Sequence, residues 1–259
     1  MRKIVAALLV LWSNLVMAQG GNLSGDLMMN VNFFQRDTNI KAAGNPLYDN
    51  YLSGGEGWLG LRYSVKGFTA TVRFDGFHNS NLQNPISALT SSGLGTFSLS
   101  KEVQNLTITA GHVYDQIGSG IIFRAYEDRG LLIDNALFGL HLKYRAGKYA
   151  TLKGFTGQTK NLFDRFKPII KGFSAEGEFD LGSKAHTTPG IGIVNRTMDQ
   201  ASINYVVSEI NNYPLAERYK PTYNNFAMTF YNTLNFGDFS WYVEAASKSK
   251  EATHYANVL

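Results

Sequence analysis

The densest group of charged side chains in the sequence lies near the middle of the chain, within twenty consecutive residues. Gly118, Ser119 and Gly120 interrupt the surrounding alternation of apolar and polar residues, where the chain needs backbone angles that glycine adopts readily. The segment 115–135 is therefore either a solvated loop with a mixed-charge surface or a loop folded back into a polar cavity, where opposite charges pair. Its charged residues are Asp115, Arg124, Glu127, Asp128, Arg129 and Asp134.

Catalytic and metal-binding patterns are weak in this sequence. Ser119 lies in IGSGI, which departs from the GxSxG nucleophile elbow, and an enzyme acting on lipids would also need a histidine and an acid within reach. His112 and His141 lack the neighbouring ligands of a metal site. Residues 55–60 match GxGxxG, but they lead into a strand and do not open a helix. The sequence therefore predicts no enzyme activity, no metal and no cofactor.

The first eighteen residues have the form of a secretory signal peptide. Arg2 and Lys3 precede an apolar run over residues 4–16, and a small-residue cleavage site ends at Ala18. The run is shorter than the ~20 apolar residues that a spanning helix needs. We therefore expect residues 1–18 to be removed on export and residues 19–259 to form one domain. The sequence has no cysteine, which excludes disulfides and a lipid-anchoring cysteine.

Charge and composition favour a β-rich domain over a nucleic-acid-binding protein. The formal charge is +4, and removing Arg2 and Lys3 leaves +2, so the mature chain is nearly balanced and predicts no nucleic-acid partner. The 26 glycines, 14 tyrosines and 17 phenylalanines, against 6 prolines, favour many strands and turns. No linker or repeat divides the mature chain.

Apolar and polar residues alternate with period two along most of the mature chain, as they do in strands with two different faces. In the strand expected after a tight turn at 66–67, Val72 and Phe74 alternate with Arg73 and Asp75. Strand register fixes both faces together, so we expect one face to contact lipid and the other to line a polar lumen. The expected lipid-facing residues are Leu61, Val72, Leu99, Ile108, Leu140, Phe179 and Phe230. The expected lumen-wall residues are Arg62, Arg73, Asp75, Glu102, His141, Lys143, Glu176 and Glu178.

Turn lengths distinguish two architectures that share this alternation. Minimal turns are predicted at 66–67, 104–105, 147, 182–184 and 237–238, and long loops at 35–57, 77–95, 115–135, 160–171 and 197–223. Short turns at one end and long loops at the other are typical of outer-membrane barrels, whereas a soluble sandwich would bury its apolar faces. Aromatic residues flank the short turns, as they would at a membrane interface, and favour the barrel: Tyr63, Phe68, Tyr144, Tyr149, Phe236 and Phe239.

The predicted fold is an all-β, antiparallel up-and-down transmembrane barrel of 11–12 strands. Eleven strands can be marked, whereas bacterial single-chain barrels close with an even number, so we expect an open sheet whose first and last strands are unpaired. The chain is accordingly expected to be truncated at its C-terminus. The markers are Leu27, Leu59, Phe68, Phe97, Leu106, Ala136, Tyr149, Phe173, Ile191, Phe226 and Phe239.

Four stretches carry a resemblance to a known family. They are NLSGDLMMNVNFFQRD, KGFTATVRF, SKEVQNLTITAGH and YDQIGSGIIFRAYEDRGLLIDNALFG. Together they resemble an uncharacterised Bacteroidetes-type family of outer-membrane β-barrels, a domain of unknown function, over nearly all the mature chain. The resemblance implies the barrel fold and a longer parent protein, of which this chain is an N-terminal part. It assigns no substrate and no catalytic residue.

These observations favour a non-enzymatic protein of the bacterial outer membrane. The leading hypothesis is porin-like passage of small solutes through a polar lumen that residues 115–135 gate or narrow. One alternative is an envelope scaffold or secretion-associated barrel that binds a protein partner, and another is a barrel enzyme acting on lipids. The expected partners are outer-membrane lipid and either a small solute or an envelope protein.

Overall fold

The computed structural model describes residues 20–35, 39, 49–83 and 87–251. The predicted signal peptide lies outside this part of the chain. Contacts between Cα atoms divide the chain into two compact units, residues 1–102 and 103–259. No helix among the described residues is long and apolar enough to span a membrane.

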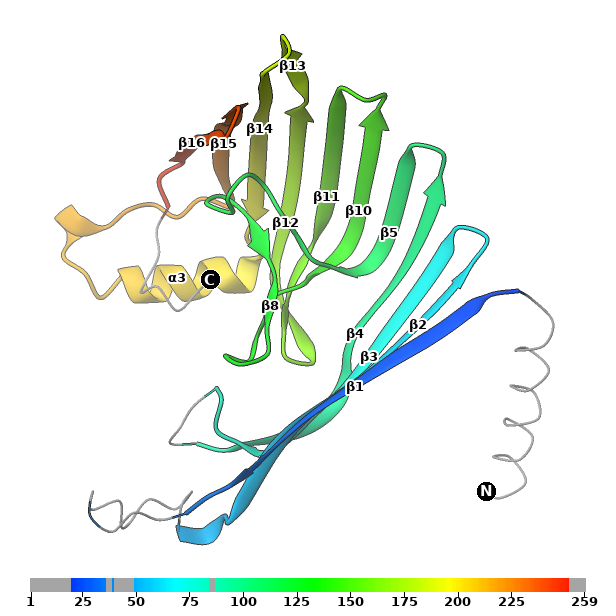
Figure 1. Ribbon diagram of the computed structural model, residues 1–259. Helices are drawn as coiled ribbons and strands as arrows, with labels where there is room; N and C mark the ends of the chain where they lie inside the picture. The colour runs from blue at the N-terminus through cyan, green and yellow to red at the C-terminus, as the bar shows by residue number, and fades with distance from the viewer. Residues whose placement is uncertain (1–19, 36–38, 40–48, 84–86, 252–259) are drawn as a thin grey trace. The chain divides into compact units, whose positions relative to one another are not determined.

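The first unit is built from antiparallel strands that follow each other in chain order (Figure 1). They are β1 (Asn22–Phe33), β2 (Ser53–Val65), β3 (Phe68–Ser80) and β4 (Leu89–Val103). Lys66 and Gly67 form the predicted tight turn between β2 and β3, both with positive φ. The alternation then separates the two faces of β3. Arg73 and Asp75 are buried, and Phe74 between them is exposed.

The second unit continues the same up-and-down pattern with seven long strands in its described part. The segment between β5 and β10 contains four short strands, and a further short strand, β13, pairs with β14 outside the main strand sequence. The long strands are β5 (Leu106–Val113), β10 (Leu137–Ala146), β11 (Ala150–Asn161), β12 (Asp164–Gly177), β14 (Ala185–Thr197), β15 (Asn224–Phe236) and β16 (Phe239–Lys248). The short ones are β6 (Asp115–Gln116), β7 (Arg124–Ala125), β8 (Glu127–Asp128), β9 (Ile133–Asp134) and β13 (Phe179–Leu181).

The expected fold class is confirmed as an all-β, antiparallel, up-and-down sheet that does not close. Among the described residues, β1 pairs with β2 alone and β16 with β15 alone. Each of the eleven strand markers lies inside a long strand or one residue before it. The minimal turns are also confirmed, since positive φ values occur at Gln104, Gly147, Gly182 and Gly237.

The expected long loop at 160–171 is wrong. β11 and β12 form a hairpin there, in which Asn161 pairs with Asp164 and Leu162 adopts a φ of 52°. Neither turn residue, Leu162 or Phe163, is a glycine, and Pro168 is a residue type that the middle of a sheet usually excludes. That proline lies where the register shifts between Gln158 and Lys160, a bulge that tolerates its missing donor. The expected loop 77–95 is also shorter, because β3 extends to Ser80 and β4 begins at Leu89.

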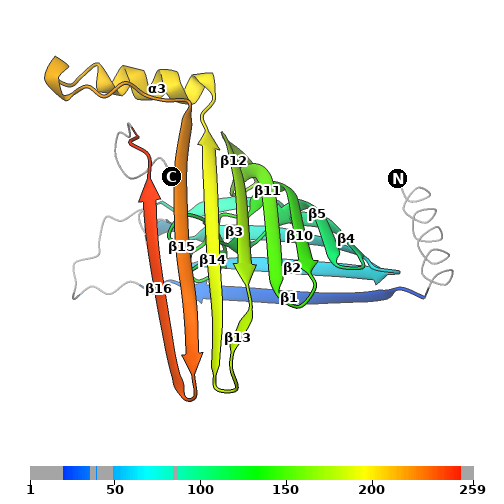
Figure 2. The same ribbon diagram turned by 90° about the horizontal axis from the view of Figure 1, so that it is seen from above.

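The expected loop 197–223 contains a helix, α3 (Gln200–Ile210), and a 3-10 turn, η1 (Leu215–Glu217). Figure 2 shows α3 beyond the ends of β14 and β15, lying across the strand direction. Asp199 caps the helix by accepting hydrogen bonds from the backbone N–H groups of Ala201 and Ser202 at 3.0 and 3.2 Å. Hydrogen bonding, first from the Ser202 hydroxyl, lowers the pKa of Asp199 below its ordinary value.

Candidate functional site

Residues 115–135 pack against one face of the second unit's sheet through apolar anchors. Ile117 is fully buried, and Phe123 stacks on Phe155 of β11 with ring centroids 4.4 Å apart. Ile117 lies against Gly192 of β14, where an added Cβ would sit 2.3 Å from the isoleucine Cγ2. A glycine at 192 is therefore what lets the segment approach the strand. The remaining members of this core are Ala125, Leu137, Val194 and Tyr231.

Asp115 begins the segment and is held by two basic side chains of the sheet. His141 Nε2 on β10 and Lys153 Nζ on β11 each lie 2.8 Å from a different oxygen of its carboxylate. The backbone N–H of Gln116 donates to the same carboxylate at 2.8 Å. Burial alone would raise the pKa of Asp115, but the hydrogen bonds from His141 and Lys153 outweigh burial and lower this pKa below its ordinary value.

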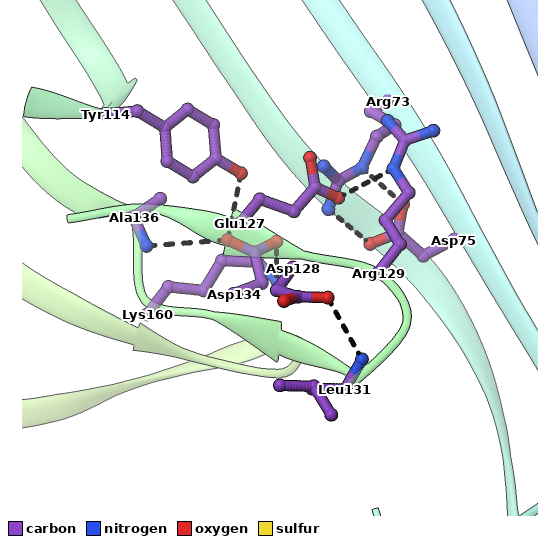
Figure 3. A network of polar contacts seen from close by, with 10 residues as sticks. All are labelled: Arg73, Asp75, Tyr114, Glu127, Asp128, Arg129, Leu131, Asp134, Ala136 and Lys160. Atoms are coloured by element: carbon purple, nitrogen blue, oxygen red, sulfur yellow. Dashed lines mark hydrogen bonds and ion pairs between the residues drawn. The ribbon is translucent and has the colours of Figure 1, made fainter. Parts of the chain in front are cut away.

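Asp134 ends the segment and is held in the same way (Figure 3). Lys160 Nζ on β11 donates to Oδ2 at 2.8 Å, and the hydroxyl of Tyr114 donates to Oδ1 at 2.9 Å. The Lys160 side chain is 3% exposed and that of Asp134 is 13% exposed, so this ion pair is largely shielded from water. Both ends of the segment are thus tied to β11 by a lysine.

Between these ends, one ion pair forms within the segment. Arg129 Nε donates to Glu127 at 2.9 Å, and Asp128 accepts a hydrogen bond from the backbone N–H of Leu131 (Figure 3). Among the described residues, Arg124 forms no ion pair with a carboxylate. Its guanidinium lies over the Tyr126 ring instead, 4.2 Å from the centroid.

The tip of the segment contacts the last strand. Glu244 on β16 accepts hydrogen bonds from the backbone N–H of Ser119 at 3.0 Å, the Thr229 hydroxyl at 2.8 Å and the Tyr242 hydroxyl at 2.6 Å. The structure therefore holds Ser119 by its backbone. His141 bonds to Asp115 and not to Ser119, so this serine and this histidine do not form a nucleophile–base pair.

The predicted lumen-wall residues have different surroundings in the two units. In the first unit, Arg73 donates two hydrogen bonds to Asp75, at 2.6 and 2.8 Å, and both are buried. In the second unit, Glu176 accepts a hydrogen bond from the Tyr231 hydroxyl at 2.6 Å. His141, which bonds to Asp115, is buried as well. The remaining four members are exposed or half-buried: Arg62, Glu102, Lys143 and Glu178.

Three anchoring residues were not expected from the sequence: Lys153, Lys160 and Glu244. The two lysines lie in β11, whose alternation is irregular, so their facing could not be read. Glu244 did carry a signal, because it alternates with Trp241, Val243 and Ala245 and therefore belongs to the polar face. His112 and His141 are not neighbours, since the register pairs His112 with Phe138 and His141 with Thr109.

Three solved structures are distantly similar to this chain over most of its length. OccK1 (OpdK) of Pseudomonas aeruginosa is 12% identical with a TM-score of 0.42, and the match covers 88% of this chain and 66% of that one. OpdL of the same organism is 10% identical with a TM-score of 0.39, covering 89% and 66%. OccAB3 of Acinetobacter baumannii is 9% identical with a TM-score of 0.40, covering 89% and 67%.

The chain thus spans about two thirds of the length of these proteins. At such identities and TM-scores the matches assign no activity to it. No curated protein sequence matches the chain significantly. The model of a family of unknown function (DUF6029) matches residues 1–258, nearly the whole sequence.

Proposed function

The chain belongs to a family of unknown function (DUF6029), and we propose that it forms part of a porin-like protein of the bacterial outer membrane. In this proposal the chain is exported through a cleaved signal peptide, and its sheet crosses the membrane. Small solutes pass along the polar face, where residues 115–135 narrow the path. The supporting observations are the distribution of apolar side chains and the anchoring of that segment.

The apolar face of the sheet is the uncovered one. Leu140 and Phe230 are 42% and 57% exposed, whereas the next residues along the same strands, His141 and Tyr231, are 8% and 4% exposed. A soluble sandwich would bury its leucines and phenylalanines and show its polar residues to water. Apolar side chains that stay exposed on strand after strand suit contact with lipid acyl chains.

Aromatic side chains form a second supporting pattern at the short turns. Phe68 and Tyr144 border two of these turns, and Phe236 and Phe239 border a third, and all four are exposed. In membrane barrels, aromatic side chains gather at the two interfaces between membrane and water, at the level of the lipid headgroups. The short turns would then face the periplasm, with the α3 end of the sheet on the outer side.

The observation that carries the porin-like function is the docking of residues 115–135 on the polar face. Loops that stay outside a barrel need no such anchors, but this segment is fixed at one end by Asp115 and at the other by Asp134. Ile117 is buried between them. A segment held on the polar face in this way restricts the width of a lumen and places its own charges beside the path.

Conductance in planar bilayers tests the proposal with the full-length protein that contains this chain. We expect steady single-channel conductance, and a larger one when residues 118–132 are replaced by a short Gly-Ser linker that keeps Asp115 and Asp134. The matched control replaces the exposed short turn 182–184 and should leave conductance unchanged. Equal conductance in both variants would refute a narrowing role for the segment.

Localisation is measured separately from conductance. We expect the full-length protein in outer-membrane fractions, with faster migration before heating than after it on detergent gels, because the folded barrel is more compact than the heat-unfolded chain. A protein that localises there but never conducts, and that co-purifies with one envelope protein, would support the scaffold alternative. Lipid hydrolysis that Ser119→Ala abolishes would support the enzyme alternative.

A further inference from the structure

A cavity of about 940 Å³ lies in the second unit, beside the segment 115–135. Residues 120–124 form one side of it, and the ends of β12, β14, β15 and β16 form the others. The volume falls within the range of sites that enclose small molecules.

Much of the cavity wall is apolar. Phe123, Val194 and Met198 line it and are themselves buried, and Ile122 and Ile170 pack against the core cluster beside them. A ligand with an apolar body can therefore lose water against this wall without burying unpaired polar groups. The apolar wall also has a lower dielectric constant than water, which strengthens the electric field of a charge at its border.

Positive charges predominate among the charged residues of the wall. Five basic residues line the cavity and only one acidic residue, Glu251, does so. Glu251 is already shared, since it forms ion pairs with both Arg196 and Lys248. The remaining basic residues are Arg124, Arg165 and Lys167.

None of these three forms an ion pair with a carboxylate in the part of the chain that the structure describes. Arg124 and Arg165 lie over aromatic rings, with guanidinium carbons 4.2 and 4.3 Å from the centroids of Tyr126 and Phe138. A cation–π contact of this kind leaves the N–H donors of the guanidinium able to bind an anion. The cavity therefore has positive charge that the protein does not neutralise.

We propose that this cavity is a binding site for a small organic anion with an apolar body. The inference rests on the proposed function and names the solute class that the path would favour. Arg124 and Lys167 bind the anionic group, and the wall around Phe123 takes the apolar part. A neutral molecule of the same shape gains only the apolar contacts, and a small hydrophilic anion gains only the charged ones. A cation is repelled.

The test measures equilibrium binding to the purified full-length protein with four probes. Benzoate has both required features, benzamide lacks the charge, acetate lacks the apolar body, and benzylamine has the opposite charge. We expect benzoate to bind about tenfold or more tightly than each of the others, because a hydrogen bond to a charged group contributes roughly that factor. Comparable binding of benzoate and benzamide would refute the role of charge.

Substitutions then locate the site. Arg124→Gln and Lys167→Gln should each weaken benzoate binding about tenfold and leave benzamide binding unchanged. Lys184→Gln is the matched control, because it removes the same charge from an exposed short turn that does not line the cavity. Benzoate binding that all three variants weaken equally would indicate a general charge effect and overturn the site.

The anion-site inference and the porin-like function can be refuted independently of each other. A protein that conducts but binds no benzoate refutes this inference and leaves the porin-like function intact. A protein that binds benzoate through Arg124 and Lys167 but does not conduct refutes the porin-like function and leaves the anion site in place.

Discussion

Removing the carboxylate of Asp134 should release the C-terminal end of the segment 115–135. Lys160 donates to this carboxylate at 2.8 Å, and its side chain is only 3% exposed, so Asp134→Ala leaves a buried ammonium group without its counter-ion. Breaking such a pair by removing one partner costs about 3 to 5 kcal/mol. Tyr114 loses its hydrogen-bond acceptor in the same variant.

A cost of this size shifts the balance between the docked and the open segment by more than about a hundredfold. Trypsin cleaves after arginine, so its rate of cleavage after Arg124 and Arg129 in the intact protein follows the open population when opening is fast. We expect Asp134→Ala to raise this cleavage rate steeply. Urea unfolding in lipid vesicles would give the accompanying loss of global stability.

The control is Asp180→Ala, which removes a carboxylate of the same kind from an ion pair with His186. That Asp180 side chain is 85% exposed, and exposed pairs contribute about 0 to 1 kcal/mol. Replacing both buried partners, with Asp134→Leu and Lys160→Met, should recover most of the loss, because no charge is then left unpaired. Equal cleavage rates in Asp134→Ala and Asp180→Ala would refute the reasoning.

Three further perturbations test the facing, the packing and the charge of the same elements. Val72→Arg should cost about 2 to 4 kcal/mol in vesicles, measured by urea titration, and Thr71→Arg much less; equal costs would contradict the assigned faces. Gly192→Ala should cost about 1 to 3 kcal/mol and raise trypsin cleavage of the segment, because its new Cβ would meet a buried isoleucine at 2.3 Å. Gly154→Ala should change neither the stability nor the cleavage rate, because nothing lies within 4 Å of its added Cβ. Similar losses of stability in both variants would count against the contact between Gly192 and Ile117. Because the folded pKa of Asp115 is lowered, its stabilising effect is present above the ordinary value of 3.8 and is lost as pH falls through the lower folded pKa. Cleavage of the segment should therefore rise below about pH 3.8 in an acid-tolerant protease assay, and an identical rise in Asp115→Asn would exclude this residue as the cause.

The sequence by itself determined the strand order and the two faces of the sheet. Alternation with period two is a local property, so Val72, Phe74 and their neighbours specify a face without any knowledge of distant residues. Glycine at 67, 147 and 237 specifies turns locally as well, because each adopts a positive φ at low cost. The number of long strands followed from these two signals.

Local signals failed where the structure departs from them. The hairpin between β11 and β12 turns at Leu162 without glycine, and its bulge absorbs Pro168. The helix α3 did carry a sequence signal, since Ile203, Val206 and Ile210 recur at helical spacing after the capping Asp199. This stretch lies within the expected long loop 197–223, and the helix was therefore missed.

Only the tertiary structure decided which charges of the segment 115–135 pair with the sheet. Asp134 meets Lys160 and Asp115 meets Lys153 because the register of β10 and β11 and the packing of Ile117 against Gly192 bring them together. Charge density in a sequence shows that partners are needed, since buried charges are costly alone. It does not select them, because the choice depends on strands that are distant along the chain and adjacent only in the folded sheet.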